Sequence, residues 1–120
     1  MTVFPLPLPP DYEAFLALHR ERYLAYARHH RPHPDADRDV AAVLEQLLRG
    51  WRGVLSHPNP ASLAWRLLTA RIHRQAGEQP PAQYDAHVLH RVLGYPVTAV
   101  AAAMGQTPAT VRYLLGVTGR

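Results

Sequence analysis

The clearest amphipathic pattern in the chain lies between residues 37 and 51. Its apolar side chains recur at intervals of three and four, a spacing that places them on one face of an α-helix. They are Val40, Val43, Leu44, Leu47, Leu48 and Trp51. We therefore expect a helix that begins at an N-cap, either Asp35 or Asp37, and buries this stripe in the core.

Two further helices are predicted on either side of it. Before it, a helix runs from an N-cap at Asp11 to about His30, where Pro32 and Pro34 prevent its continuation. After it, Asn59 is predicted to cap a helix that has a proline at its first position, where no hydrogen bond is lost. Their apolar faces consist of Phe15, Leu18, Tyr23 and Tyr26, and of Leu63, Leu67, Leu68 and Ile72. Residues 11–75 should thus form a three-helix domain, preceded by an extended, proline-rich arm over residues 1–10.

The C-terminal part is predicted to form a smaller helical lobe. Residues 76–81 contain two prolines and a glycine but no large apolar residue, and we interpret them as a linker. A helix that ends at Gly94 follows, with an apolar face of Tyr84, Val88, Leu89, Val92 and Leu93. Because the roughly 40 residues of 82–120 bury little apolar surface alone, we expect this lobe to lean on the first domain or on a partner.

The end of the chain has the spacing of a helix-turn-helix. Ala101 permits close approach of the two helices, Gly105 tolerates the positive φ of a tight turn, and Val111 buries the second helix against the first. Thr107 followed by Pro108 is a typical helix start. Such a module predicts DNA contact through the exposed side of its second helix, by Gln106, Thr107, Thr110, Arg112 and Tyr113.

Composition narrows the class of protein. Ala, Leu and Arg abound, β-branched residues are sparse and no strand-like alternation persists, so the predicted fold class is all-α. The chain lacks cysteine and has no window of about 18 apolar residues, which favours a cytoplasmic protein without disulfides or membrane spans. Its net charge is +4 with neutral histidines, and ten Arg against seven acidic residues place +3 of this in residues 1–75. This charge permits attraction to nucleic acid or to an acidic protein.

Three segments follow one another in an order that is typical of one protein family. They are DADRDVAAVLEQLLRGW, HPNPASLAWRLLTARIHRQ and TPATVRYLL. With them the chain resembles a bacterial RNA polymerase sigma factor of the small extracytoplasmic-function type, over roughly residues 11–116. The resemblance implies an N-terminal domain similar to sigma region 2 and a C-terminal helix-turn-helix domain similar to sigma region 4.

The resemblance also implies roles for individual residues. The helix that begins at DAD would contact RNA polymerase, through Asp35, Asp37, Asp39, Glu45, Gln46 and Arg49. The helix around Trp65 would read the minus-ten promoter element, with Arg66, Arg71 and Arg74 along the phosphate backbone. The chain departs from the family where Ala41 and Ala42 replace acidic or amide side chains, and where Trp65 is the sole aromatic residue of its helix. We therefore expect a reduced sigma-like regulator with weakened DNA and polymerase contacts.

The residues leave other classes of protein open. An interaction module, either a partner-dependent subunit or a homodimer, would keep the sigma architecture without reading DNA, and a stand-alone repressor would need a dimer to place two reading helices one DNA turn apart.

The chain has no glycine-rich phosphate loop, activated nucleophile or acid–base carboxylate pair, so we expect neither an enzyme nor a cofactor. The histidine clusters at 29–33 and 87–90 lack a complete ligand set, so we expect no metal and place the histidines at the surface. Trp51 and Trp65 are predicted core residues.

Overall fold

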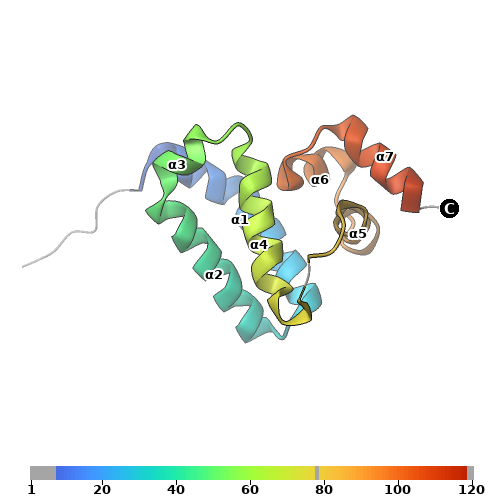
Figure 1. The fold of residues 1–120 in the computed structure, drawn as a ribbon, viewed down its shortest axis with the longest axis horizontal. Helices are drawn as coiled ribbons and strands as arrows, with labels where there is room; N and C mark the ends of the chain where they lie inside the picture. Colours follow the sequence, from blue (N-terminus) through green and yellow to red (C-terminus); the bar gives the residue numbers. More distant parts are fainter. Residues whose placement is uncertain (1–7, 78, 119–120) are drawn as a thin grey trace, which may run out of the picture.

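The structure, a computed structural model, describes residues 8–77 and 79–118, and the regular secondary structure of these residues is entirely helical, as the composition predicts. The helices lie in two groups, with α4 between α2 and the C-terminal helices (Figure 1). The first group, called the N-terminal lobe here, consists of α1 (Pro10–His30), α2 (His33–Arg49), α3 (Trp51–Ser56) and α4 (Pro60–Ile72). The second, the C-terminal lobe, follows a 3₁₀ turn η1 (Arg74–Ala76) and consists of α5 (Ala82–His87), a π-helical turn η2 (Val88–Val92), α6 (Val97–Met104) and α7 (Pro108–Thr118).

The core of the N-terminal lobe lies where α1, α2 and α4 meet. The apolar stripe predicted for α2 faces inward, since Val40, Val43 and Leu47 are each 1% exposed. Tyr23 of α1 and Leu68 of α4 are fully buried against it. Removing a side chain of this size from water stabilises the fold by about 1.5–3 kcal/mol, so the stripe accounts for much of the packing of this lobe.

The start of α1 differs from the prediction. The helix begins at Pro10, so residue 10 does not belong to the extended arm, while residues 1–7 of that arm lie outside the described residues. Asp11 is not an N-cap. Its Oδ1 accepts hydrogen bonds from the backbone N–H of Tyr12 and from Nε1 of Trp51, both at 2.9 Å. Because the helix already begins at Pro10, Asp11 lies inside its first turn, and its carboxylate ties α1 to α3 through Trp51.

The second predicted helix also starts earlier than expected and is interrupted. α2 begins at His33 with a proline in its first turn, so neither Asp35 nor Asp37 is its N-cap. The helix ends at Arg49, and Gly50 separates it from α3, which carries Trp51. Trp51 is nevertheless buried, at 8% exposed, as the spacing predicts.

The helix starts predicted at Asn59 and Thr107 are confirmed. The Asn59 side chain accepts a hydrogen bond from the N–H of Ser62 at 3.1 Å, and the Thr107 hydroxyl accepts one from the N–H of Thr110 at 3.1 Å. Each cap is followed by a proline at the first helical position. Both caps satisfy a backbone donor that the helix itself leaves unpaired.

The turn between α6 and α7 has the predicted geometry. Gly105 has φ 69° and ψ 38°, and Ala101 and Val111 are 3% and 0% exposed between the two helices. The same glycine lies against the start of α4, where a Cβ atom would stand 2.7 Å from Cα of Ser62. Nδ2 of Asn59 donates a hydrogen bond to the carbonyl oxygen of Gly105 at 2.7 Å. The turn is therefore seated on the N-terminal lobe.

A buried carboxylate makes a second connection between the lobes. Asp85 of α5 is 4% exposed. Its Oδ1 accepts a hydrogen bond from the Tyr26 hydroxyl at 2.5 Å, and its Oδ2 accepts one from Nε1 of Trp65 at 3.0 Å. Both donors belong to the N-terminal lobe and are themselves buried. We call Tyr26, Trp65 and Asp85 the lobe joint.

Three residues predicted in the core lie at the surface. Leu18 is 49% exposed, Tyr84 38% and Val92 51%. Leu18 lies outside the face of α1 that its buried residues, such as His19 and Tyr23, define. A π turn has more residues per turn than an α-helix, so η2 rotates Val92 away from the buried face that precedes it.

His19 corrects the prediction that the histidines lie at the surface, because it is 4% exposed and stacks on Tyr23. Burial, with a smaller contribution from Arg22, lowers its pKa to about 4. The unfolded chain takes up this proton near pH 6.5, so the free energy of unfolding should fall as pH drops from 6.5 toward 4, by about 2–3 kcal/mol. His19→Leu should remove this contribution in urea titrations at pH 7 and pH 4.5.

The matched control for this prediction is His29→Leu, which removes an exposed histidine of the same helix. It should keep the wild-type difference between the two pH values. Identical pH dependence of the wild-type and His19→Leu proteins would show that His19 is not held in its neutral form by burial.

Candidate DNA and partner interfaces

The exposed side of α7 and its turn carries the predicted DNA contacts. Gln106, Thr107, Arg112 and Tyr113 are exposed, and Tyr113 is 70% accessible. Thr110 is half-buried, and its hydroxyl oxygen accepts a hydrogen bond from Thr107 at 2.9 Å. The opposite side of α7, Val111, Leu114 and Leu115, is buried. The helix therefore presents a polar face to solvent while its apolar face holds it on α5 and α6.

The three arginines predicted along the phosphate backbone have different surroundings. Arg66 and Arg74 are exposed and form no ion pair with any residue in the described part of the chain. Arg71 instead pairs with Oδ1 of Asp39 at 3.1 Å, and Arg31 pairs with Oδ2 of the same carboxylate at 2.8 Å. Arg71 therefore holds α4 to α2, and Arg66 and Arg74 remain available to a phosphate.

Contacts predicted separately for the two lobes meet at one place. Arg66 of α4 and Gln106 of the turn line the same hollow, which has a volume of about 250 Å³. Ser62 and Thr69 of α4 contribute hydroxyl groups to its wall, and Gln79 lies at its edge with its amide donating to Thr69 at 2.6 Å. The structure therefore brings side chains from α4 and from the turn before α7 to one hollow, whose lining also includes the apolar Trp65 and Met104.

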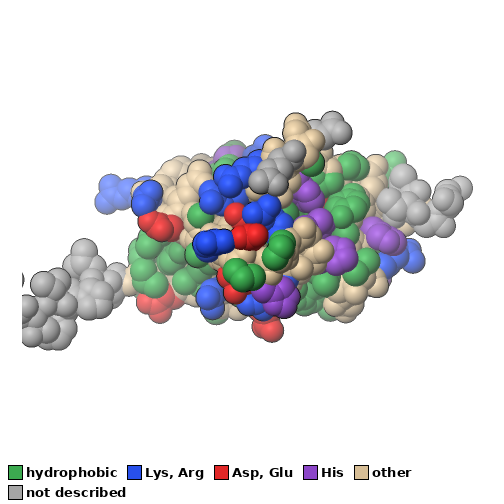
Figure 2. Space-filling view, turned by 90° about the horizontal axis from the view of Figure 1, so that it is seen from below, with side chains coloured by type: hydrophobic (Ala, Val, Ile, Leu, Met, Phe, Trp, Pro, Cys, Tyr) green, Lys and Arg blue, Asp and Glu red, His purple; other side chains and the backbone are tan. Residues whose placement is uncertain are grey.

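Three of the four acidic residues predicted to contact a partner are exposed or half-buried, and each of the three is paired with an arginine. Asp37 pairs with Arg28 at 2.9 Å, and two further pairs, Asp35 with Arg38 and Glu45 with Arg49, lie along α2. Gln46 is exposed. Figure 2 shows arginine and acidic side chains mixed over the middle of the face that lies at the bottom of Figure 1, where α1 passes into α2. Exposed pairs of this kind stabilise a fold by about 1 kcal/mol or less. A partner can therefore replace them with ion pairs to its own side chains at little cost in free energy.

Asp39 is the exception in this acidic set. It is 4% exposed, and both of its carboxylate oxygens face arginines of the same chain. In this arrangement it offers no carboxylate to a partner, and its role is to join α1, α2 and α4.

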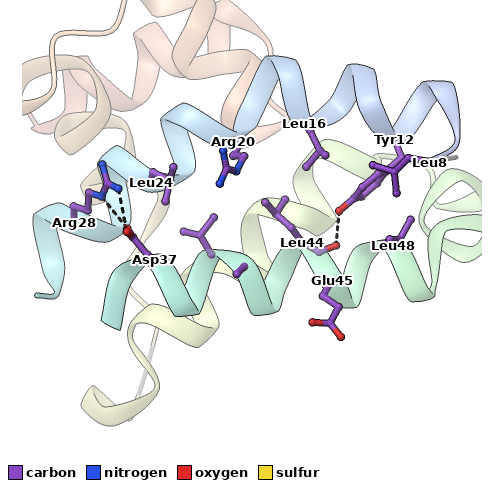
Figure 3. A pocket seen from close by; sticks show the side chains of 12 residues that line it. Leu8, Tyr12, Leu16, Arg20, Leu24, Arg28, Asp37, Leu44, Glu45 and Leu48 are labelled. Carbon is purple, nitrogen blue, oxygen red and sulfur yellow. Dashed lines mark hydrogen bonds and ion pairs between the residues drawn. The ribbon is translucent and has the colours of Figure 1, made fainter. Parts of the chain in front are cut away.

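A groove that the sequence did not reveal runs between α1 and α2. It has a volume of about 380 Å³, and Figure 3 shows its side chains along the two helices, with the Arg28–Asp37 ion pair near one end and Leu8 near the other. Leu16 of α1 faces Leu44 of α2 across it, Leu48 of α2 lies near Tyr12 and Leu8, and Leu24 lies toward the ion-pair end. The wall formed by α1 and the segment just before it repeats every fourth residue, at Leu8, Tyr12, Leu16, Arg20, Leu24 and Arg28. This four-residue spacing is visible in the sequence, but the aromatic residues on another face of α1 form the stronger pattern and conceal it.

The lobe joint lies in surroundings that shift the pKa values of its ionisable groups. Burial raises the pKa of Asp85 to about 6, although the hydrogen bonds from Tyr26 and Trp65 oppose that shift. Burial, together with the Asp85 charge, raises the pKa of Tyr26 above its usual range. Asp85 is therefore a carboxylate at neutral pH, and Tyr26 stays protonated and donates to it.

Two histidines next to the joint are held in defined neutral forms. Nδ1 of His30 lies 2.9 Å from the carbonyl oxygen of Tyr26 and must donate, so Nε2 accepts from the Tyr84 hydroxyl at 2.6 Å. The Tyr26 proton points to Asp85, so Nε2 of His73 donates to the Tyr26 oxygen at 2.9 Å. Burial lowers the pKa of both histidines. They extend the hydrogen bonds of the joint to the ends of α1 and α4.

Nothing in the described residues groups three His, Asp or Glu side chains in a way that could hold a metal ion. Each helix in the same part of the chain is too short or too polar to cross a membrane. Comparisons of the chain with protein-family models, with curated proteins and with solved structures find no match.

Proposed function

We propose that this chain is a sigma-factor-like transcription regulator that contacts promoter DNA with its C-terminal lobe and RNA polymerase with its N-terminal lobe. The observation that carries the proposal is the α6–turn–α7 geometry. Gly105 has the left-handed conformation of the turn, Thr107 caps the second helix, and Arg112 and Tyr113 lie exposed on it. A helix that is held by its apolar side and polar on the other fits the major groove of DNA.

The N-terminal lobe supports the polymerase part of this proposal through the α1–α2 groove. The groove is lined by leucines, and its α2 rim carries Glu45 and Asp37. An amphipathic helix of a partner protein would bury its apolar side chains between these helices and place polar groups against the rim. We assign RNA polymerase as this partner on the resemblance of the segment that begins at Asp35 to the polymerase-binding helix of sigma factors.

The second candidate function is an interaction module that no longer reads DNA. It is favoured by the ion pair between Arg71 and the buried carboxylate of Asp39, which occupies this cation. It is also favoured by the burial of Trp65, which is 4% exposed and bonded to Asp85. A strand-opening helix needs aromatic rings that reach the bases, and α4 presents none in this arrangement. Either a second protein or a second copy of this chain would then occupy the groove.

Substitution of Arg112 separates the two functions. Arg112→Ala should lower promoter occupancy of the tagged protein at least about tenfold, because it removes a cation that serves either a phosphate or a guanine edge. Chromatin immunoprecipitation in the source organism measures this, and circular dichroism checks that the exposed substitution leaves the fold intact. Arg52→Ala, which removes an exposed arginine of α3, is the matched control and should keep occupancy. Unchanged occupancy in Arg112→Ala would remove α7 as the reading helix and favour the interaction module.

A further inference from the structure

The predicted DNA contacts of the two lobes lie within a short distance of each other. Arg66 and Gln106 line one hollow of about 250 Å³. From Gln106 the chain reaches Arg112 within about 15 Å, given two extended residues and one helical turn. Arg66 and Arg112 therefore lie within about 25 Å of each other, which is less than one turn of B-form DNA, about 34 Å. Both are exposed and form no ion pair with a residue that the structure describes.

Contacts from three elements fix this spacing. Gly105 is seated on the backbone of Ser62, and Asn59 donates to the Gly105 carbonyl at 2.7 Å. Asp85 binds Tyr26 of α1 at 2.5 Å and Trp65 of α4 at 3.0 Å. Buried, fully paired polar groups specify one arrangement, because separating them leaves each group without its partner. The lobes are thus joined as one body, and α7 has a fixed position relative to α4.

We infer that α4 and α7 contact a single, contiguous duplex segment of about one helical turn, and not two elements separated by a spacer. The inference rests on the proposed DNA-reading function and adds the kind of site that is read. Arg66 supplies a cation to the backbone of the same turn whose groove receives α7. Gln106, which lines the same hollow as Arg66 and precedes α7 in the chain, contacts the same stretch of bases or phosphates.

Selection from a pool of random double-stranded oligonucleotides with the full chain tests this. The expected result is enrichment of one uninterrupted motif of about ten base pairs or less. On the selected duplex, Arg66→Gln and Arg112→Gln should each weaken binding about tenfold and each lower the salt dependence of log K by about 0.9. Arg52→Gln, on α3, should change neither quantity.

The outcomes separate the inference from the proposed function. Two enriched blocks with a spacer of a full turn or more would overturn the inference while leaving DNA reading in place. The same holds if Arg112→Gln weakens binding and Arg66→Gln behaves like Arg52→Gln. Absence of any binding to the pool at low salt would overturn both.

Discussion

Asp85→Ala should lower the free energy of unfolding by about 3 kcal/mol at pH 7. The substitution leaves the Tyr26 hydroxyl and the Trp65 indole N–H buried without an acceptor, and each such orphaned donor costs about 1–3 kcal/mol. The space of the carboxylate adds a small cavity to this loss. Urea titration followed by tryptophan fluorescence measures the effect, and Trp65 itself reports on the joint because its nitrogen donates to Asp85.

Two matched variants define what Asp85 contributes. Asp85→Asn retains one acceptor oxygen of the two that Tyr26 and Trp65 use, so it should lose about half as much stability. Asp37→Ala removes an exposed partner of Arg28 and should leave the free energy of unfolding nearly unchanged, because solvent screens this pair. Burial raises the pKa of Asp85 to about 6, so the folded protein binds a proton at a higher pH than the unfolded chain does. The free energy of unfolding of the wild type therefore rises as pH falls from 6 toward 4. Asp85→Asn cannot bind this proton, so its deficit relative to the wild type should grow over that range. A loss below about 1 kcal/mol for Asp85→Ala would contradict a buried joint.

Gly105→Ala should be about as damaging, with a loss of about 3 kcal/mol or more. The backbone there has φ 69°, which costs an L-residue about 1–2 kcal/mol. The added Cβ would also stand 2.7 Å from Cα of Ser62 and 2.8 Å from the carbonyl carbon of Ala61, both backbone atoms that cannot rotate away. The turn must then lift from α4, and the helix-turn-helix loses its seat on the N-terminal lobe.

Two other glycines separate the components of that loss. Gly94 has φ 82°, and an added Cβ there would meet no atom within 4 Å, so Gly94→Ala carries the backbone strain alone and should cost about 1–2 kcal/mol. Gly53 in α3 has neither a positive φ nor a neighbour at that distance, so Gly53→Ala should be neutral or stabilise by up to about 1 kcal/mol. If Gly105→Ala costs no more than Gly94→Ala in thermal or urea unfolding, the close contact between the turn and α4 does not exist.

The parts of the fold that follow from local periodicity were predictable. The α2 stripe, the caps at Asn59 and Thr107 and the turn at Gly105 each depend on residues within a few positions of one another. The helix starts at α1 and α2 were wrong for a local reason as well. Both helices begin earlier, with a proline in the first turn, so Asp11, Asp35 and Asp37 lie inside the helices and not at their N-caps.

The lobe joint could not be predicted because its partners are distant in the sequence. Asp85 lies 59 residues from Tyr26 and 20 from Trp65. An aspartate in a short amphipathic segment is typical of an exposed residue, and nothing in its neighbours indicates burial. Asp39 and Arg71, 32 residues apart, were assigned to opposite interfaces for the same reason. The candidate DNA residues are exposed or half-buried, and Arg71 among them is occupied by its ion pair with Asp39. The lobe joint fixes the positions of these residues relative to each other.

Whether this chain is a polymerase-binding regulator is tested most directly with purified components. The full chain is mixed with RNA polymerase core enzyme from its source organism, treated with nuclease, and followed by size-exclusion chromatography. We expect co-elution, and a loss of affinity of about tenfold or more for Glu45→Arg on the rim of the α1–α2 groove. Glu13→Arg, at an exposed position of α1 that does not line the groove, should bind like the wild type. Separate elution of the unaltered chain and the core enzyme would contradict polymerase binding and leave the interaction module as the function to pursue.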